Sequence, residues 1–258
     1  MIHNNYLKDR LHQKLVGTHI SMTDSIVSEM EGRLGYDFIW IDTEHSEISY
    51  TNLRNHITAV NAGGTPAIVR VSMNDYNHVK RVMEMGPDGI IFPMINTAEQ
   101  AQAAMEFCMY PPEGRRGFGP LRAVNYGLDD MDEYIRIANS KTCRFIQIET
   151  VTAVENLPQI VKNPYIDGYI FGPCDLSGSL GELNQVFGEK TQSVIRRAIS
   201  ILREAGKPIG VSTGSTDRAV TEFWHDLGIN IISTGTDYDY ILRGAAENLA
   251  TMRQFMKN

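Results

Sequence analysis

The sequence predicts a closed (β/α)8 barrel, and three observations lead to this fold class. Eight short apolar runs alternate with longer segments of helical period along the 258 residues. The runs are rich in Val, Ile and Phe and almost continuous, as in parallel strands that are buried on both faces. The glycine-rich turn that follows the first strand of a doubly wound nucleotide-binding sheet is missing. Because no linker is visible, one barrel domain is expected to span residues 1–258.

Eight strands and eight helices are predicted in alternation. The strands are expected at 15–21, 37–45, 65–71, 89–95, 143–149, 168–176, 208–213 and 229–235. The helices are expected at 50–62, 75–85, 97–108, 129–139, 151–161, 190–205, 217–227 and 238–257. Several helices end next to a glycine, such as Gly206 or Gly228, which is typical of a left-handed C-terminal cap. The first 14 residues are compatible with a further helix across the barrel floor.

The segment 109–128 interrupts the alternation with Pro, Gly, Arg and aromatic residues. A loop of this length in a compact domain is usually functional or disordered. Its cations Arg115, Arg116 and Arg122 could reach an acidic substrate, although a solvated loop surface is the usual explanation for such a cluster. Trp224, on the helix at 217–227, is expected to be buried against the sheet.

Composition excludes several function classes. The chain has 24 basic and 31 acidic residues, so its formal charge is −7, and nucleic-acid binding is not expected. No apolar run approaches the roughly 20 residues that span a bilayer, and the N-terminus lacks the apolar core of a signal peptide. The cysteines, Cys108, Cys143 and Cys174, form no CxxC pair. A reducing cytoplasm without membrane partners is therefore expected.

Polar residues end several of the apolar runs, and this pattern predicts the active site. In a (β/α)8 barrel the catalytic groups lie at the carboxyl ends of the strands. Glu149 and Asp175 end consecutive strands, and two convergent carboxylates suit Mg²⁺ or Mn²⁺. Gln147 precedes Glu149 by two residues and therefore shares its strand face. The alternative is that Glu149 caps the next helix and Asp175 orders its own loop.

Two further strand ends carry groups suited to acid–base or electrostatic catalysis. His45 is a candidate general acid or base, with Asp42 or Glu44 as its carboxylate partner. Otherwise it is a strand-end histidine that bonds nearby backbone. Arg70 is a candidate ligand for a substrate carboxylate or an enolate oxygen, and a structural ion pair with Glu44 or Asp42 is the alternative.

Two other types of chemistry have little or ambiguous support in the sequence. No lysine lies at the carboxyl end of a predicted strand, which disfavours imine chemistry. The segment 212–215, Ser-Thr-Gly-Ser, is a candidate phosphate cradle, and a tight turn explains it equally well.

Six segments of the sequence carry a recognisable set of motifs. They are FIWIDTEHS (38–46), PAIVRVSMND (66–75), GPDGIIFPMINTAEQA (86–101), YPPEGRRGFGP (110–120), IQIETVTAVENL (146–157) and GPCDLSGSLG (172–181). Together they resemble the class II pyruvate aldolases, the family of 2-dehydro-3-deoxyglucarate aldolase and 4-hydroxy-2-oxoheptanedioate aldolase. The motifs occur in the same order as in that family, and the likeness extends from about the first strand to the last helix.

The resemblance implies a barrel of the phosphoenolpyruvate/pyruvate type and a homo-hexamer, a trimer of dimers that exchange their C-terminal helices. It implies that Glu149 and Asp175 hold Mg²⁺, Mn²⁺ or Co²⁺. It also implies that Arg70 holds the C2 oxygen of pyruvate and that His45 with Asp42 forms the acid–base dyad.

The resemblance further implies a set of substrate contacts: the Gln147 side chain, and the backbone turn of Gly172, Pro173, Cys174 and Asp175 for the pyruvate carboxylate.

The departures from the family pattern lie on the side of the aldehyde. Thr43 and Ser46 flank the dyad, Cys174 replaces a smaller residue, and His19 stands where tryptophan is frequent. Ser212 ends the seventh strand where an apolar residue is frequent, and we include it among the substrate-binding residues.

The expected activity is the metal-dependent, reversible cleavage of a 4-hydroxy-2-oxo acid into pyruvate and an aldehyde. The alternatives are a lyase of the citrate-lyase or malyl-CoA type and a non-catalytic pyruvate- or metal-binding barrel. The identity of the aldehyde stays open.

Overall fold

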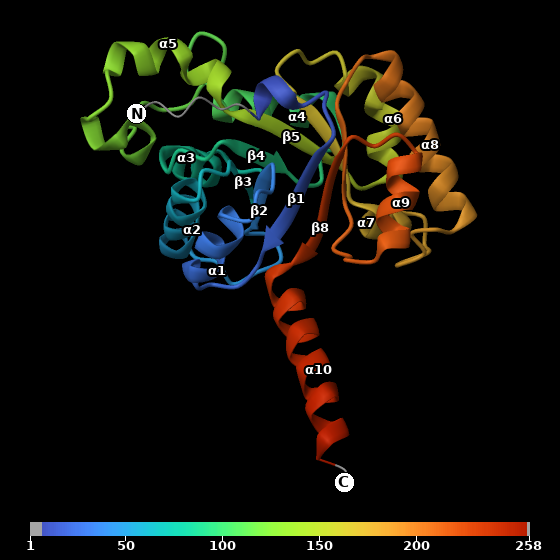
Figure 1. The fold of residues 1–258 in the computed structure, drawn as a ribbon. Coiled ribbons are helices and arrows are strands. Elements are labelled where there is room, and N and C mark those ends of the chain that lie inside the picture. Colours follow the sequence, from blue (N-terminus) through green and yellow to red (C-terminus); the bar gives the residue numbers. More distant parts are fainter. Residues whose placement is uncertain (1–6, 257–258) are drawn as a thin grey trace.

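A computed structural model describes residues 7–256, and its strands form a closed parallel barrel in the order β1 to β8 (Figure 1). The strands are β1 (Leu15–Ile20), β2 (Phe38–Asp42), β3 (Ala67–Arg70), β4 (Gly89–Phe92), β5 (Cys143–Ile148), β6 (Gly168–Phe171), β7 (Ile209–Ser212) and β8 (Ile231–Thr236). The predicted (β/α)8 fold class is confirmed.

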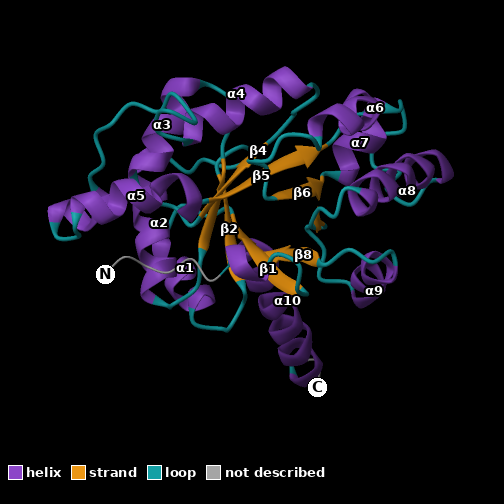
Figure 2. Cartoon of the chain, turned by 90° about the horizontal axis from the view of Figure 1, so that it is seen from above, coloured by secondary structure: helices purple, strands orange, loops and turns teal. Residues whose placement is uncertain are grey.

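Most of the helices lie around the strands, as the view from above shows (Figure 2). They are α1 (Ser25–Gly32), α2 (Tyr50–Ala62), α3 (Tyr76–Glu84), α4 (Ala98–Cys108), α5 (Met131–Lys141), α6 (Val151–Ile160), α7 (Pro173–Ser179), α8 (Glu189–Glu204), α9 (Arg218–Asp226) and α10 (Asp237–Phe255). Two 3-10 turns, η1 (Lys8–Arg10) and η2 (Arg122–Gly127), complete the described elements.

Local sequence signals explain where the helices begin and end. Ser49 and Asn52 form a reciprocal capping box at the start of α2. Thr97 caps α4 in the same way with Gln100. Gly206 follows the end of α8 with a φ of 64°, in the left-handed conformation that the sequence predicts there.

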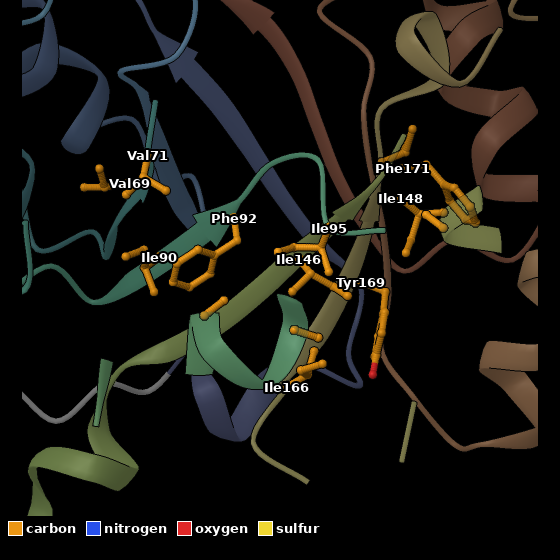
Figure 3. Packing of buried hydrophobic residues seen from close by; sticks show 14 of the residues in the cluster. Val69, Val71, Ile90, Phe92, Ile95, Ile146, Ile148, Ile166, Tyr169 and Phe171 are labelled. Atoms are coloured by element: carbon orange, nitrogen blue, oxygen red, sulfur yellow. The ribbon is translucent and has the colours of Figure 1, made fainter. Parts of the chain in front are cut away.

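The apolar residues of the strands are buried on both faces of the barrel wall. Neighbouring residues of β5 pack on opposite faces of the strand. Phe145 belongs to the apolar cluster inside the barrel, and Ile146 belongs to the larger cluster between the barrel and the helices. Figure 3 shows this outer cluster, in which Ile146 lies near Ile95 and Tyr169. Trp224 also packs in the outer cluster and is buried, as predicted. Burial of both faces explains why the runs are nearly continuous in sequence.

Two strands are shorter than predicted. β2 ends at Asp42, and Glu44 and His45 lie in the loop that follows. β6 ends at Phe171, whereas a strand was expected to reach residue 176. Gly172 precedes α7, and Pro173 stands at its first turn, where the fixed φ of proline suits a helix. Asp175 is consequently a residue of this helix.

Other elements also differ from expectation. α1 is absent from the predicted helices, and the side chain of Asp24 caps its start. Of the helix considered for the first 14 residues, the structure describes only η1, and residues 1–6 lie outside the described residues. Leu7 and Leu11 pack in the same cluster as Phe145 and thereby cover the barrel floor.

α10 leaves the end of β8 and projects away from the barrel (Figure 1). No helix within residues 7–256 is both long and apolar enough to cross a membrane.

Candidate active site

Arg70 lies at the centre of the polar residues at the barrel mouth. From the end of β3 its Nε donates to Asp42 Oδ1 at 3.0 Å, and its Nη2 donates to Asp42 Oδ2. Its Nη1 lies 2.9 Å from Glu44 Oε2 and 3.5 Å from Gln147 Oε1. The guanidinium also lies over the indole of Trp40, 5.3 Å from the ring centroid. Both partners predicted for a structural ion pair therefore contact Arg70, and this fixes the orientation of its charge.

The carboxylate of Asp42 is bound to Arg70 and to backbone. Its Oδ1 accepts hydrogen bonds from the backbone N–H groups of Glu44 and His45 at 2.9 and 3.3 Å. Burial alone would raise the pKa of Asp42, but its hydrogen bonds to Arg70 and the charge of Arg70 outweigh that effect and lower it. Asp42 is therefore an ionised partner of Arg70.

Glu149 lies beside this ion pair in a buried position just after β5, with 3% of its surface exposed. Its Oε1 accepts from Gln147 Nε2 at 2.8 Å, and its Oε2 accepts from the backbone N–H of Met94 at 2.8 Å. Burial raises the pKa of Glu149 to about 7, with smaller contributions from the charges of Glu44 and Asp175. The carboxylate is thus positioned by fixed donors but has a high affinity for a proton.

Gly172 makes room for the Glu149 carboxylate. A Cβ atom at this position would lie 2.5 Å from Glu149 Oε1, closer than real contacts allow. This is a direct physical reason for glycine where β6 gives way to α7.

The acidic residues around Glu149 suit a divalent cation chemically. Asp175 is exposed in the first turn of α7, and its charge and that of Glu44 both act on Glu149. Carboxylate oxygens are the ligands that Mg²⁺ and Mn²⁺ prefer, and a cation bound by Glu149 would displace the proton that its raised pKa favours. Within residues 7–256, no three His, Cys, Asp or Glu side chains are already gathered as a complete ligand group.

His45 lies at the edge of the mouth, where 64% of its side chain is exposed. Its Nε2 is 3.8 Å from Glu44 Oε2, and its bond with Asp42 is made by the backbone N–H. The expected contact between the side chains of His45 and Asp42 is thus absent from the hydrogen bonds of the described residues. Glu44, the other carboxylate that the sequence suggested, is the one whose side chain approaches the His45 ring.

The remaining predicted substrate residues separate into two groups. Pro173 is buried, and Cys174 is exposed next to Asp175 at the start of α7. Ser212 ends β7 and bonds to His19, whose ring is buried at the end of β1. His19 differs from the family pattern, and its contact with Ser212 forms only because the closed barrel brings β1 and β7 to either side of β8. Thr213 accepts a hydrogen bond from the backbone of Ser215, as in the tight turn considered for this segment.

The arginines of the 109–128 segment are engaged away from the barrel mouth. Arg116 is buried and pairs with Glu84 at 3.1 Å. Arg122 donates to the carbonyl of Met85 at 2.7 Å, at the C-terminal end of α3. Because α3 leads into the start of β4, this end of the barrel is opposite the strand C-termini. Within one chain, these two cations do not reach the predicted substrate site.

Comparison with known proteins identifies the family. Residues 16–243 match the family model described as HpcH/HpaI aldolase/citrate lyase. The chain belongs to the HpcH/HpaI aldolase/citrate lyase family. This assignment agrees with the resemblance seen in the sequence.

Relatives of known activity cover nearly the whole chain. A hydroxypyruvate/pyruvate aldolase of Roseobacter denitrificans is 32% identical over 94% of this chain and 94% of its own length. A 2-keto-3-deoxy-L-rhamnonate aldolase of Klebsiella pneumoniae is 34% identical over 86% of this chain and 82% of its own length. A solved structure of a family protein from Burkholderia cenocepacia superposes with a TM-score of 0.90 at 27% identity, covering 96% of this chain and 99% of that chain. The protein is thus an enzyme of the aldolase type, a carbon–carbon lyase.

Proposed function

We propose that the protein is a divalent-metal-dependent aldolase that reversibly cleaves a 4-hydroxy-2-oxo acid into pyruvate and an aldehyde. The observation that carries this proposal is the arrangement of Arg70, Gln147 and Glu149. A fixed positive charge and a buried carboxylate are joined through one amide side chain at the barrel mouth. The guanidinium can bind an oxygen of an anionic 2-oxo acid directly, whereas the carboxylate would act on it through a divalent cation.

Arg70 would stabilise the negative charge that develops when the carbon–carbon bond breaks. Cleavage leaves the enolate of pyruvate, with its charge concentrated on the former ketone oxygen. A guanidinium already oriented by Asp42 and largely removed from water stabilises that oxygen more strongly than a mobile surface arginine would.

Glu149 and Asp175 would hold the metal, and Gln147 and the Met94 N–H would orient the Glu149 carboxylate. When bound there, a divalent cation supplies Lewis-acid stabilisation of negative charge on the substrate oxygens. The oxygen donors do not choose among Mg²⁺, Mn²⁺ and Co²⁺. The turn from Gly172 to Asp175 remains the proposed contact for the pyruvate carboxylate.

His45 would move the proton of the C4 hydroxyl group. Its exposed imidazole lies at the mouth, where an aldehyde enters and leaves, and Glu44 is placed to orient it. In this assignment Asp42 acts through Arg70 rather than as the partner of the His45 side chain.

The test is proton NMR of pyruvate in D₂O with the purified protein and Mg²⁺. Loss of the methyl signal that stops when EDTA is added supports the proposal, because it reports enolate formation without any aldehyde. Glu149→Gln should suppress the exchange, whereas Glu155→Gln, a change of the same type on the exposed side of α6, should leave it unchanged. Absence of exchange with Mg²⁺, Mn²⁺ and Co²⁺ would contradict the proposal and lead next to CoA thioesters.

We also propose that the single barrel domain assembles into a homo-hexamer, a trimer of dimers in which α10 packs on a partner subunit. α10 projects from the barrel and exposes apolar side chains at helical spacing, including Leu242, Leu249 and Met252. An exposed stripe of this kind is typical of a helix that packs against another chain. A cytoplasmic location is proposed as well, since the three cysteines are scattered along the sequence and form no CxxC pair.

A further inference from the structure

A cavity lies at the end of the barrel opposite to the catalytic residues. Its volume is about 340 Å³, within the range of small-molecule sites. Asp88 and Thr142 line it, and they immediately precede β4 and β5, respectively. Helix α5, which contributes Tyr134 and Lys141 to the lining, lies at the opposite end of the barrel from α10 (Figure 1). The cavity is therefore separate from the barrel mouth.

Three cations and two carboxylates line this cavity. The cations are Arg116, Arg122 and Lys141, and the carboxylates are Asp88 and Asp129. One oxygen of Asp88 accepts a hydrogen bond from the backbone N–H at the start of β3 at 2.9 Å, so this carboxylate also supports the barrel wall. The excess of positive charge in the lining favours an anionic ligand.

Arg122 is held in the cavity wall by uncharged groups. Its Nε donates to Thr58 Oγ1 at 3.1 Å, and its Nη2 donates to Asn61 Oδ1 at 3.1 Å. Its Nη1 donates to the carbonyl oxygen of Met85 at 2.7 Å. Every hydrogen bond that Arg122 makes within residues 7–256 goes to an uncharged oxygen. Burial lowers the pKa of Arg122, so its positive charge is less stable here than in water and would be stabilised by an anion.

Arg116 brings a second buried guanidinium to the same cavity, with 3% of its surface exposed. Its Nη2 pairs with Glu84 at 3.1 Å, whereas its Nε has no hydrogen-bond partner among the described residues. A buried donor without an acceptor is unfavourable. Since Arg116 lines the cavity, an anion bound there can supply the missing acceptor.

The backbone of η2 is strained where it lines the cavity. Asn125 and Tyr126 both belong to the lining, and their φ angles are 49° and 57°. These values lie in the left-handed region, which a bulky residue such as tyrosine rarely adopts. Strained backbone of this kind is frequent where a loop surrounds a ligand. The strained turn thus lies at the same cavity as the two buried arginines.

We propose that this cavity binds a small organic anion that carries a carboxylate or phosphate group, and that Arg116 and Arg122 contact that group. A planar guanidinium recognises either group through paired hydrogen bonds. Met83, Pro87 and Ala123 provide an apolar wall for the rest of the ligand. This inference does not depend on the proposed aldolase reaction, because the cavity shares no residue with the proposed catalytic site.

The experiment is isothermal titration calorimetry with two probes, succinate for the carboxylate and glycerol 3-phosphate for the phosphate group. EDTA is present throughout, so that no divalent metal holds a probe at the barrel mouth. The wild-type protein should bind at least one probe with a submillimolar Kd, and the probe that binds identifies the anionic group. The Kd should stay the same when pyruvate is added, because the mouth lies at the other end of the barrel.

Arg122→Gln should weaken binding by about tenfold or more, as expected when a hydrogen bond to a charged group is lost. Arg115→Gln is the matched control, because this arginine of the same segment is exposed and pairs with Glu106. It should leave the Kd unchanged. Equal affinity of Arg122→Gln and the wild-type protein would overturn the inference.

Hydrogen exchange followed by mass spectrometry locates the site in the wild-type protein and decides the question if Arg122→Gln fails to fold. The bound probe should slow exchange in residues 120–130 and 137–142 and leave residues 42–46 and 172–176 unchanged. Protection confined to the mouth, or a Kd that rises with added pyruvate, would place the anion at the catalytic site and overturn the inference. Absence of binding by both probes at about 10 mM would overturn it as well.

Discussion

The Arg70 guanidinium donates two parallel hydrogen bonds to the Asp42 carboxylate, from Nε to Oδ1 at 3.0 Å and from Nη2 to Oδ2. The two side chains are 10% and 8% exposed, so most of this pair is removed from water. A two-point contact of this kind fixes the plane of the guanidinium as well as its position. Asp42 thereby determines which direction the remaining Arg70 N–H groups face.

Replacing Asp42 should destabilise the protein. Asp42→Asn removes the charge that balances Arg70, and an unbalanced buried charge costs about 3 kcal/mol of unfolding free energy. Denaturant unfolding should show this loss, and Asp226→Asn, at an exposed carboxylate on α9, should change stability by less than about 0.5 kcal/mol. A loss below about 1 kcal/mol for Asp42→Asn would mean that Glu44 alone can balance Arg70.

Metal affinity should depend on pH through Glu149. Its pKa is raised to about 7, so below that pH the carboxyl holds a proton that a cation must displace. Mn²⁺ affinity should therefore rise by about tenfold per pH unit up to pH 7 and then level off. Isothermal titration calorimetry at pH 5.5, 6.5 and 7.5 measures this, and the Glu149→Gln variant should bind weakly at every pH. A flat profile in the wild-type protein would argue against Glu149 as a ligand.

Adding one methyl group at Gly172 should impair the site without unfolding the barrel. The new Cβ would lie 2.5 Å from Glu149 Oε1, so the carboxylate has to move. Gly172→Ala should lower Mn²⁺ affinity and the pyruvate exchange rate by about tenfold or more, as small displacements of catalytic groups do. Gly119→Ala is the matched control, because a Cβ there meets no atom within 4 Å. If both variants had the same Mn²⁺ affinity and the same exchange rate, the Glu149 carboxylate could move without loss of function.

Glu31 should make folding stability depend on pH. Its carboxyl is 5% exposed, and burial followed by the charge of Asp237 raises its pKa from 4.5 to about 8. The folded state then binds the proton more tightly than the unfolded state, so the contribution is complete below pH 4.5 and is lost as pH rises toward 8.

Glu31→Gln should remove the loss of folding stability that occurs as the pH rises. We expect the variant to be more stable than the wild-type protein by about 2 kcal/mol at pH 7, with the difference vanishing near pH 4.5. Urea unfolding at pH 5 and pH 7.5 measures both values. A difference that is the same at the two pH values would show that Glu31 is not titrating over this range.

A charge on the exposed face of α10 should break the proposed assembly. Leu249 is 51% exposed in the isolated chain, and burying a lysine in its place at a subunit contact is costly. Leu249→Lys should yield smaller species by size-exclusion chromatography with light scattering. Glu247→Lys introduces the same side chain on the other side of the helix and should leave the assembly intact. A wild-type protein that elutes as a monomer would refute the assembly outright.

The fold and much of the mouth could be predicted because they depend on local patterns. Near-continuous apolar runs identified the strands, and polar residues at the ends of these runs predicted that Arg70 and Glu149 lie at the carboxyl ends of the strands. Ser49, Thr97 and Gly206 mark helix ends by bonds within a few residues, which sequence spacing can reveal.

The partners of the side chains could not be predicted in this way. The sequence left Asp42 free to pair with either His45 or Arg70, and only the register of β2 and β3, which places Asp42 opposite Arg70, decided between them. The start of α7 after Gly172 was also missed, because the space needed for the Glu149 carboxylate comes from a different strand.

The sequence by itself determined the barrel, the family and the chemical types of group at the mouth, since these follow from periodicity and motif order along one chain. Only the tertiary structure decided which distant side chains meet. The Ser212 hydroxyl lies 3.0 Å from Nε2 of His19, which is 193 positions away in the chain, and Nδ1 of His19 lies 2.9 Å from the Gly235 carbonyl oxygen. Hydrogen bonds between such distant residues exist only after the strands have closed.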